Sequence, residues 1–133
     1  MSVKVEKLPE EPVIVLTYEG HLDVETVTSA FAQSRALAES MSGVVYRISD
    51  VRLGQGDFRD VIQVMGQVRA GVPGSSADPK IKGVLVGTHQ MARLYADMMR
   101  QSQFGGVQIP FFKTVEEALD YIHVDQQSHH QAE

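Results

Sequence analysis

Apolar and polar residues alternate at the start of the chain, where Val3 and Val5 are interleaved with charged residues. A second apolar run follows at residues 13–18, after a turn at residues 8–12. Alternation with a period of two is typical of strands. Because a parallel return needs a connection of about a dozen residues or more, these two strands are predicted to be antiparallel neighbours.

Beyond the second strand the apolar spacing changes to three and four residues, which is typical of helices. A first helix is followed by three strand-then-helix units, with strands predicted at residues 44–49, 81–86 and 107–112. Pro110 lacks a backbone N–H group, so the last strand is predicted to lie at an edge of the sheet. The four helices are predicted to begin at N-cap residues, namely Asp23, Asp57, Thr88 and Thr114.

The second helix illustrates how the buried faces are predicted. Its apolar residues recur at helical spacing, and the stripe is predicted to comprise Phe58, Val61, Ile62, Met65 and Val68. This stripe is expected to face the sheet.

The order of elements is therefore β-β-α-β-α-β-α-β-α, an α/β protein with a five-stranded mixed sheet whose first strand is antiparallel. Right-handed crossovers between strands in chain order place the helices mainly on one face. Arg47 and Ser49 share one face of the central strand, and Tyr46 and Ile48 share the other. A sheet covered on both faces would have more continuous apolar runs. We therefore expect one face to be partly open and to be a candidate homodimer surface.

Composition narrows the class of protein. The 133 residues carry a formal charge of −5, which argues against a nucleic-acid or anionic-membrane partner. There is no cysteine, which excludes disulfides and thiolate chemistry. Neither a signal peptide nor a transmembrane segment is predicted, so we expect a cytoplasmic protein. We expect one domain at residues 1–124 and a polar, disordered tail at 125–133.

With this order of elements the chain resembles the STAS and SpoIIAA-like family, the anti-sigma-factor antagonist fold. The hairpin at the start and the three following βα units match across almost the whole chain. The sequence Phe-Phe-Lys-Thr-Val-Glu-Glu-Ala-Leu at 111–119 is similar to the strand, cap and helix that close many such domains. The resemblance implies a non-catalytic, regulatory protein-interaction module with a protein partner.

One departure from the family concerns its phosphorylatable Ser or Thr, which sits at the start of the helix after the central strand. The matching stretch here is Gly-Gln-Gly-Asp-Phe at 54–58, with no hydroxyl residue between Asp50 and Asp57. The usual serine phospho-switch is therefore predicted to be lacking. Asp57 either supplies a permanent negative charge at a helix start, where the helix dipole favours it, or is only the N-cap.

Ligands of open α/β sheets bind beyond the carboxyl ends of the strands. The residues that we expect there, and that are candidates for binding a small anion or polar metabolite together with free N–H groups of helix starts, are Asp50, Arg52, Asp57, Thr88, His89 and Lys113. The alternative is that they are caps and solvated charges.

Asp50, Thr88 and Lys113 also follow the order of the Asp, Thr and Lys of response-regulator receiver domains. A degenerate receiver is therefore a further alternative. A receiver needs a helix between its first two strands, and residues 8–12 leave no room for one.

Tyr95, Met98, Met99 and Phe104 lie close together in sequence. If they face outward they form an apolar patch for a protein partner or a lipid tail; otherwise the methionines fill gaps in the core. No catalytic residue, cofactor or metal site is predicted, because the glycine pairs lack the rest of a dinucleotide or phosphate-loop motif and the histidines are isolated.

Overall fold

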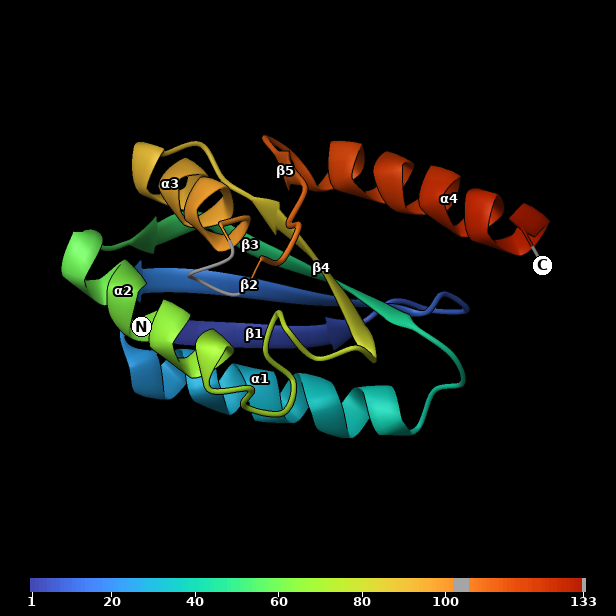
Figure 1. Ribbon diagram of the computed structural model, residues 1–133, viewed down its shortest axis with the longest axis horizontal. Coiled ribbons are helices and arrows are strands. Elements are labelled where there is room, and N and C mark those ends of the chain that lie inside the picture. The colour runs from blue at the N-terminus through green and yellow to red at the C-terminus, as the bar shows by residue number, and fades with distance from the viewer. Residues whose placement is uncertain (102–105, 133) are drawn as a thin grey trace.

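The computed structural model describes residues 1–101 and 106–132 (Figure 1). The strands of this described part are β1 (Ser2–Lys7), β2 (Val13–His21), β3 (Val45–Gln55), β4 (Ile81–Val86) and β5 (Phe111–Phe112). Its helices are α1 (Val24–Glu39), α2 (Phe58–Arg69), α3 (Gln90–Met99) and α4 (Val115–Ala132). Among these helices, none is both long and apolar enough to cross a membrane.

The five strands form one sheet in the order β1-β2-β3-β4-β5. β1 is antiparallel to β2, and the remaining neighbours are parallel. The predicted α/β fold, with its mixed five-stranded sheet and antiparallel first strand, is confirmed. β5 lies at an edge, as Pro110 predicted, although only residues 111–112 pair with β4.

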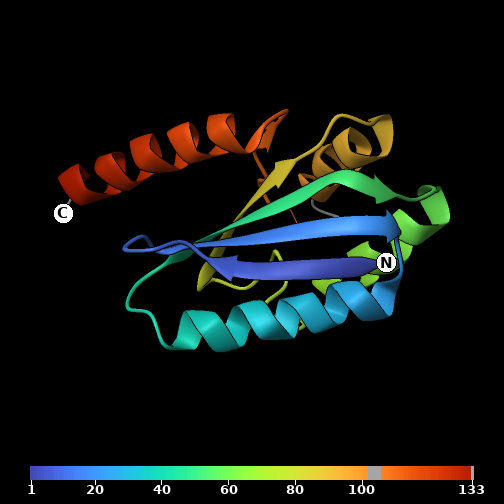
Figure 2. The same cartoon turned by 180° about the vertical axis from the view of Figure 1, so that it is seen from behind.

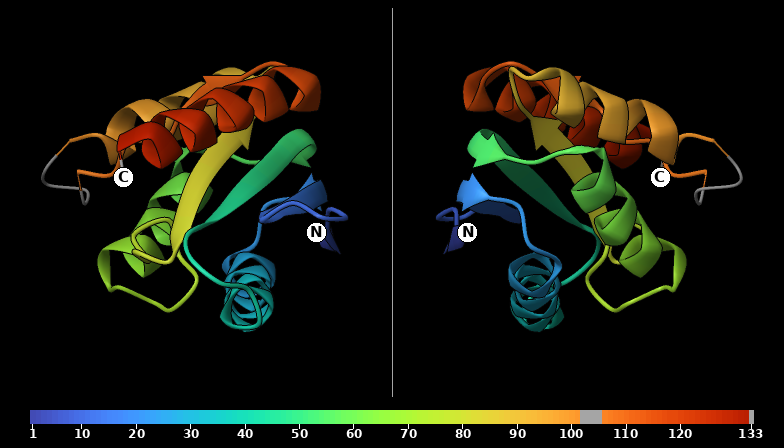
Figure 3. Two further views of the ribbon diagram at one scale, coloured as in Figure 1. Left: turned by 90° about the vertical axis from the view of Figure 1, so that its right-hand side faces the viewer. Right: turned by 90° about the vertical axis from the view of Figure 1, so that its left-hand side faces the viewer.

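The helices form two layers. The larger core lies between the sheet and α1, α2 and α3, and a smaller core lies between the sheet and α4. Figure 2 shows α1 and α4 on opposite sides of the strands, and Figure 3 shows the same arrangement from the two ends. Three of the four helices thus share one face, as the chain order of the strands predicted.

The position of Arg47 identifies the more completely covered face. Its side chain lies under the layer of α1, α2 and α3 and is 1% exposed. Its guanidinium lies 4.9 Å from the ring centroid of Phe31 on α1. The opposite face, with Tyr46 and Ile48, is the one that α4 covers in part, because α4 packs against β3, β4 and β5.

β3 continues beyond the predicted end at residue 49. Residues 53–55 pair with residues 19–21 of β2, so the strand extends to Gln55. Asp50 and Arg52 consequently lie within a strand and not in a loop after it. This extension depends on pairing with a distant segment. The glycines in this stretch favoured a turn, so the longer strand was not predicted.

The segment from Asp125 also differs from expectation. It was predicted to be a disordered tail, but α4 continues through it to Ala132. The Tyr46 hydroxyl donates to Asp125 Oδ2 at 2.5 Å, and Lys82 Nζ lies 3.1 Å from the same oxygen. His123 Nε2 lies 2.6 Å from Glu11 Oε1 in the β1–β2 turn. Polar contacts therefore hold the second half of α4, which lies beyond the apolar residues of its first half.

The buried face of α2 comprises Val61, Val64, Met65 and Val68. Val64 was not predicted, and two predicted members of the stripe face solvent: Phe58 is 52% exposed and Ile62 is 37% exposed. The buried face of α2 is therefore rotated relative to the predicted stripe. Its residues recur at 61, 64, 65 and 68, which is a narrower helical face.

Candidate functional site

Three of the predicted site residues meet beside the second half of β3. Arg52 binds the Asp50 carboxylate through two of its nitrogens, with Nε at 3.0 Å from Oδ1 and a terminal nitrogen at 2.8 Å from Oδ2. The Arg52 backbone N–H also donates to Asp50 Oδ1 at 3.1 Å. His89 Nε2 lies 3.2 Å from the carbonyl oxygens of Val51 and Arg52. An N–H on this nitrogen therefore donates to the β3 backbone.

This cluster already contains opposite charges that are paired with each other. The hydrogen bond and the charge of Asp50 raise the pKa of Arg52 above its ordinary value. Asp50 is 5% exposed, so its carboxylate is matched by Arg52 in a largely buried position. A free anion at Arg52 would have to compete with this bidentate pair, which weakens support for an anion site in the crevice.

The other predicted crevice residues do not join the cluster. Thr88 is exposed, and the N-cap of α3 is His89, without a side-chain cap hydrogen bond. The predicted Thr88 cap is therefore wrong, because α3 begins one residue later. Lys113 is exposed just after β5. The antiparallel pairing of β1 and β2 also leaves no helix between them, contrary to what a receiver domain requires.

Asp57 forms the predicted N-cap of α2. Its Oδ1 accepts from the Asp60 N–H at 3.0 Å, and Asp60 Oδ2 accepts from the Asp57 N–H at 3.0 Å. The Asp60 N–H holds the pKa of Asp57 below its ordinary value. A carboxylate is thus fixed in its ionised form at an exposed helix start.

The structure describes three of the four residues that would form an apolar patch around α3 if they faced outward. Met99 is fully buried, while Tyr95 and Met98 pack against the same core. Phe104 lies outside the described residues. The alternative prediction, that the methionines fill gaps in the core, is therefore correct for Met99.

An exposed apolar group lies elsewhere, around the start of α2. Phe58 and Ile62 are one helical turn apart, and Leu53, 62% exposed, lies near the end of the strand that leads to the helix. We call Phe58 and Ile62 the α2 patch. Sequence reasoning assigned both of these residues to the core and so missed the patch.

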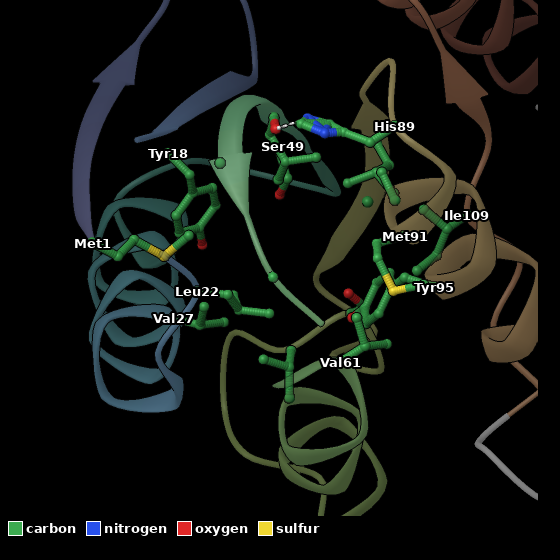
Figure 4. Close-up of a pocket in the computed structure, with 18 of the residues that line it drawn as sticks. Met1, Tyr18, Leu22, Val27, Ser49, Val61, His89, Met91, Tyr95 and Ile109 are labelled. Carbon is green, nitrogen blue, oxygen red and sulfur yellow. Dashed lines mark hydrogen bonds between the residues drawn. The ribbon is translucent and has the colours of Figure 1, made fainter. Parts of the chain in front are cut away.

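A cavity of about 140 Å³ lies between the sheet and the three-helix layer (Figure 4). Its walls are mainly apolar and come from β2, β3, β4, α1, α2 and α3. The polar side chains in the wall are Tyr18, Arg47, Ser49, Gln55, Ser76, His89 and Tyr95. Among the described residues, the Arg47 Nε is a buried side-chain nitrogen without a hydrogen-bond partner. The sequence signalled this site through an arginine in the middle of one strand and a glycine, Gly83, in the next.

No family model matches the chain, and no curated protein is similar enough in sequence to be matched. Solved structures do match. The order of strands and the two helix layers define a small α/β domain of the type found in anti-sigma-factor antagonists.

The structure of the anti-sigma factor antagonist SpoIIAA in its unphosphorylated form matches with a TM-score of 0.55 and 20% identity, over 92% of this chain and 98% of that chain. An uncharacterized DUF3478 protein from Shewanella loihica PV-4, with a SpoIIAA-like fold, matches with a TM-score of 0.54 and 15% identity, over 90% and 91%. An anti-sigma factor antagonist from Mycobacterium paratuberculosis matches with 0.54 and 12%, over 92% and 93%. The chain therefore has a SpoIIAA-like fold.

Proposed function

We propose that the chain is a non-catalytic, cytoplasmic protein-interaction module with a regulatory role, and that it acts without a phosphorylated serine at the start of α2. The SpoIIAA-like fold supports this, since two of the similar structures are of anti-sigma factor antagonists. The observation that carries the proposal is the exposure of Phe58, at 52%, one turn from Ile62 and next to Asp57.

Exposed aromatic and aliphatic side chains that are grouped together are typical of binding surfaces. In the family that the sequence resembles, the phosphorylatable hydroxyl lies at this helix start. Here Asp57 supplies a negative charge that needs no kinase. The partner surface that suits this site is apolar, with a basic group facing Asp57.

The α2 patch is tested by affinity capture from the source cells, followed by titration of the purified partner. The double variant Phe58→Ser/Ile62→Ser removes the patch. Val124→Ser is the matched control, because Val124 is 63% exposed on α4. We expect the partner to bind the parent and the Val124 variant and to bind the double variant at least tenfold more weakly. Equal binding by all three would contradict the proposal.

The role of Asp57 is separated from capping by Asp57→Asn. Asparagine caps a helix about as well as aspartate, so the substitution removes the charge and keeps the helix start. Weaker partner binding with an unchanged melting temperature would support a role for the charge. Unchanged binding would leave Asp57 as an N-cap alone.

We also propose a homodimer formed through the uncovered part of the sheet face on which α4 packs, near β1 and β2. Lys4 and Glu6 are exposed there and lie 3.4 Å apart. Sedimentation of the purified chain is expected to give a dimer mass, and a monomer at about 50 μM would contradict this, since even weak dimers form at that concentration.

A further inference from the structure

The cavity between the sheet and the three-helix layer is large enough for an organic molecule. Its volume is about 140 Å³, close to the ~150 Å³ of an apolar protein cavity that holds benzene. The space therefore suits one aromatic ring or a short alkyl chain. Gln55, Gly56 and His89 line it at the carboxyl ends of the strands and are exposed or half-buried, so this end lies nearest to solvent.

Small residues keep this space open. Gly83 lies in the middle of β4, opposite Arg47 and on the face that α1, α2 and α3 cover. A Cβ atom at Gly83 would meet only the Ser76 Oγ, at 3.9 Å, within contact range. Ser49, on the same face of β3, is only half-buried although it lies in a central strand. A larger side chain at either position would occupy the cavity.

The cavity wall also carries a positive charge that makes no ion pair with a described carboxylate. The Arg47 guanidinium donates to the Gly74 carbonyl oxygen, while its Nε has no partner. Within residues 1–101 and 106–132, no carboxylate lies at ion-pair distance from Arg47; Asp78 is instead bound to Arg35 at 2.7 Å. Arginine remains charged in proteins, and a buried charge is costly unless it is paired.

Two tyrosines add hydroxyl groups to the same wall. Figure 4 shows Tyr18 and Tyr95 on opposite sides of the cavity, from β2 and α3 respectively. Burial raises the pKa of both hydroxyls, so both stay protonated and can donate hydrogen bonds. Beside Ser49, Gln55, Ser76 and His89, the cavity wall thus carries a cation and two neutral phenol hydroxyls.

We infer that this cavity binds a small organic monocarboxylate, with its ring or alkyl chain among the apolar side chains and its carboxylate paired with Arg47. A carboxylate matches the planar guanidinium and supplies a counter-charge at ion-pair distance. A bound water would satisfy Nε but would leave the charge unpaired. This site is separate from the α2 patch and goes beyond the proposed interaction function.

The probes are benzoate and hexanoate, compared with their neutral analogues benzyl alcohol and hexanol. Binding is followed by the methyl NMR signals of isotope-labelled methionines. Met91 lines the cavity, whereas Met41 lies at the periphery of the core and serves as the internal control. We expect one of the carboxylates to shift the Met91 signal with a dissociation constant of about 1 mM or lower, at least tenfold tighter than its alcohol.

Two variants test the position of the bound molecule. Gly83→Val fills the cavity and is expected to weaken carboxylate binding at least tenfold, while Gly66→Ala, on the exposed side of α2, leaves it unchanged. Arg47→Met is expected to abolish the preference for the acid over the alcohol. If Arg47→Met does not fold, Gly83→Val and the acid-to-alcohol comparison still decide. Absence of a Met91 shift with both acids at about 10 mM, well above a millimolar constant, or unchanged binding by Gly83→Val, would overturn the inference.

Discussion

The hydroxyl of Tyr46 in the central strand donates a 2.5 Å hydrogen bond to Asp125 in α4. Tyr46 is 4% exposed, and its hydrogen bond to Asp125 is partly shielded from water. Lys82 on the neighbouring strand lies 3.1 Å from the same carboxylate oxygen. The second half of α4 is therefore attached to the sheet by a charge-assisted contact.

Removing this hydroxyl is expected to destabilise the fold. Tyr46→Phe should lower the free energy of unfolding by about 1.5 kcal/mol, because hydrogen bonds to charged groups contribute ~1.5–3 kcal/mol. Urea unfolding followed by circular dichroism measures the difference. Tyr121→Phe is the control: it keeps the ring contact with Phe112, at 5.4 Å between centroids, and should change stability by less than about 0.5 kcal/mol. Equal effects would show that the Asp125 contact contributes nothing.

The same residue predicts a response to alkaline pH. Burial, reinforced by the hydrogen bond and charge of Asp125, raises the pKa of Tyr46 above its ordinary value. A raised folded-state pKa gives stability that is complete below the unfolded pKa, about 10, and that is lost as pH rises further. The parent should therefore lose stability above about pH 10 more steeply than Tyr46→Phe. Parallel stability curves would contradict the assignment.

Gly74 is expected to tolerate no side chain. Its φ is +84°, and a Cβ would lie 1.9 Å from the Phe31 carbonyl oxygen. Gly74→Ala combines a left-handed backbone with a clash against backbone, so it should cost about 3 kcal/mol or more. Gly66→Ala is the control, because nothing lies within 4 Å of its Cβ and alanine favours helices by about 0.5–1 kcal/mol. Thermal unfolding should move in opposite directions for the two variants.

Local signals in the sequence were sufficient for the topology. The short link between the first strands required an antiparallel pair, and the caps Asp23, Asp57 and Thr114 accept N–H groups of their helices as predicted. These features depend on residues within a few positions of one another. The full lengths of β3 and α4 depend on contacts with distant segments and could not be predicted in this way.

The candidate site was less predictable because the sequence does not show which face of the central strand is the more completely covered. Arg47 lies over Phe31 and donates to Gly74 on a loop far away in sequence. Gly83 was a usable signal, since glycine within a strand often marks a close approach or an empty space. The ion pair between Asp50 and Arg52 joins residues two apart in a strand. The rules for side-chain pairs in helices cover residues three and four apart, so they did not predict it.

Asp78 holds the loop that supplies the Gly74 carbonyl to Arg47. Its carboxylate accepts from the Gly74 N–H at 2.8 Å and the Lys80 N–H at 2.9 Å, and binds Arg35 at 2.7 Å. Burial alone would raise the pKa of Asp78, but these N–H groups and Arg35 outweigh it and lower the pKa. The ionised carboxylate therefore stabilises the folded state.

Asp78→Asn should lower the free energy of unfolding at pH 7 by about 2 kcal/mol, because a charged acceptor of several hydrogen bonds is lost. With a lowered folded-state pKa, the contribution is complete above the unfolded pKa of about 3.9 and is lost as pH falls through the folded value. The acid limb of the stability curve should thus be shallower in Asp78→Asn than in the parent. Glu39→Gln is the control, because Glu39 is the other partner of Arg35 and is 63% exposed. This variant should change stability by less than about 0.5 kcal/mol at any pH. If the two variants gave the same acid limb, the loop would be held by its backbone alone, and the position of Arg47 would not depend on Asp78.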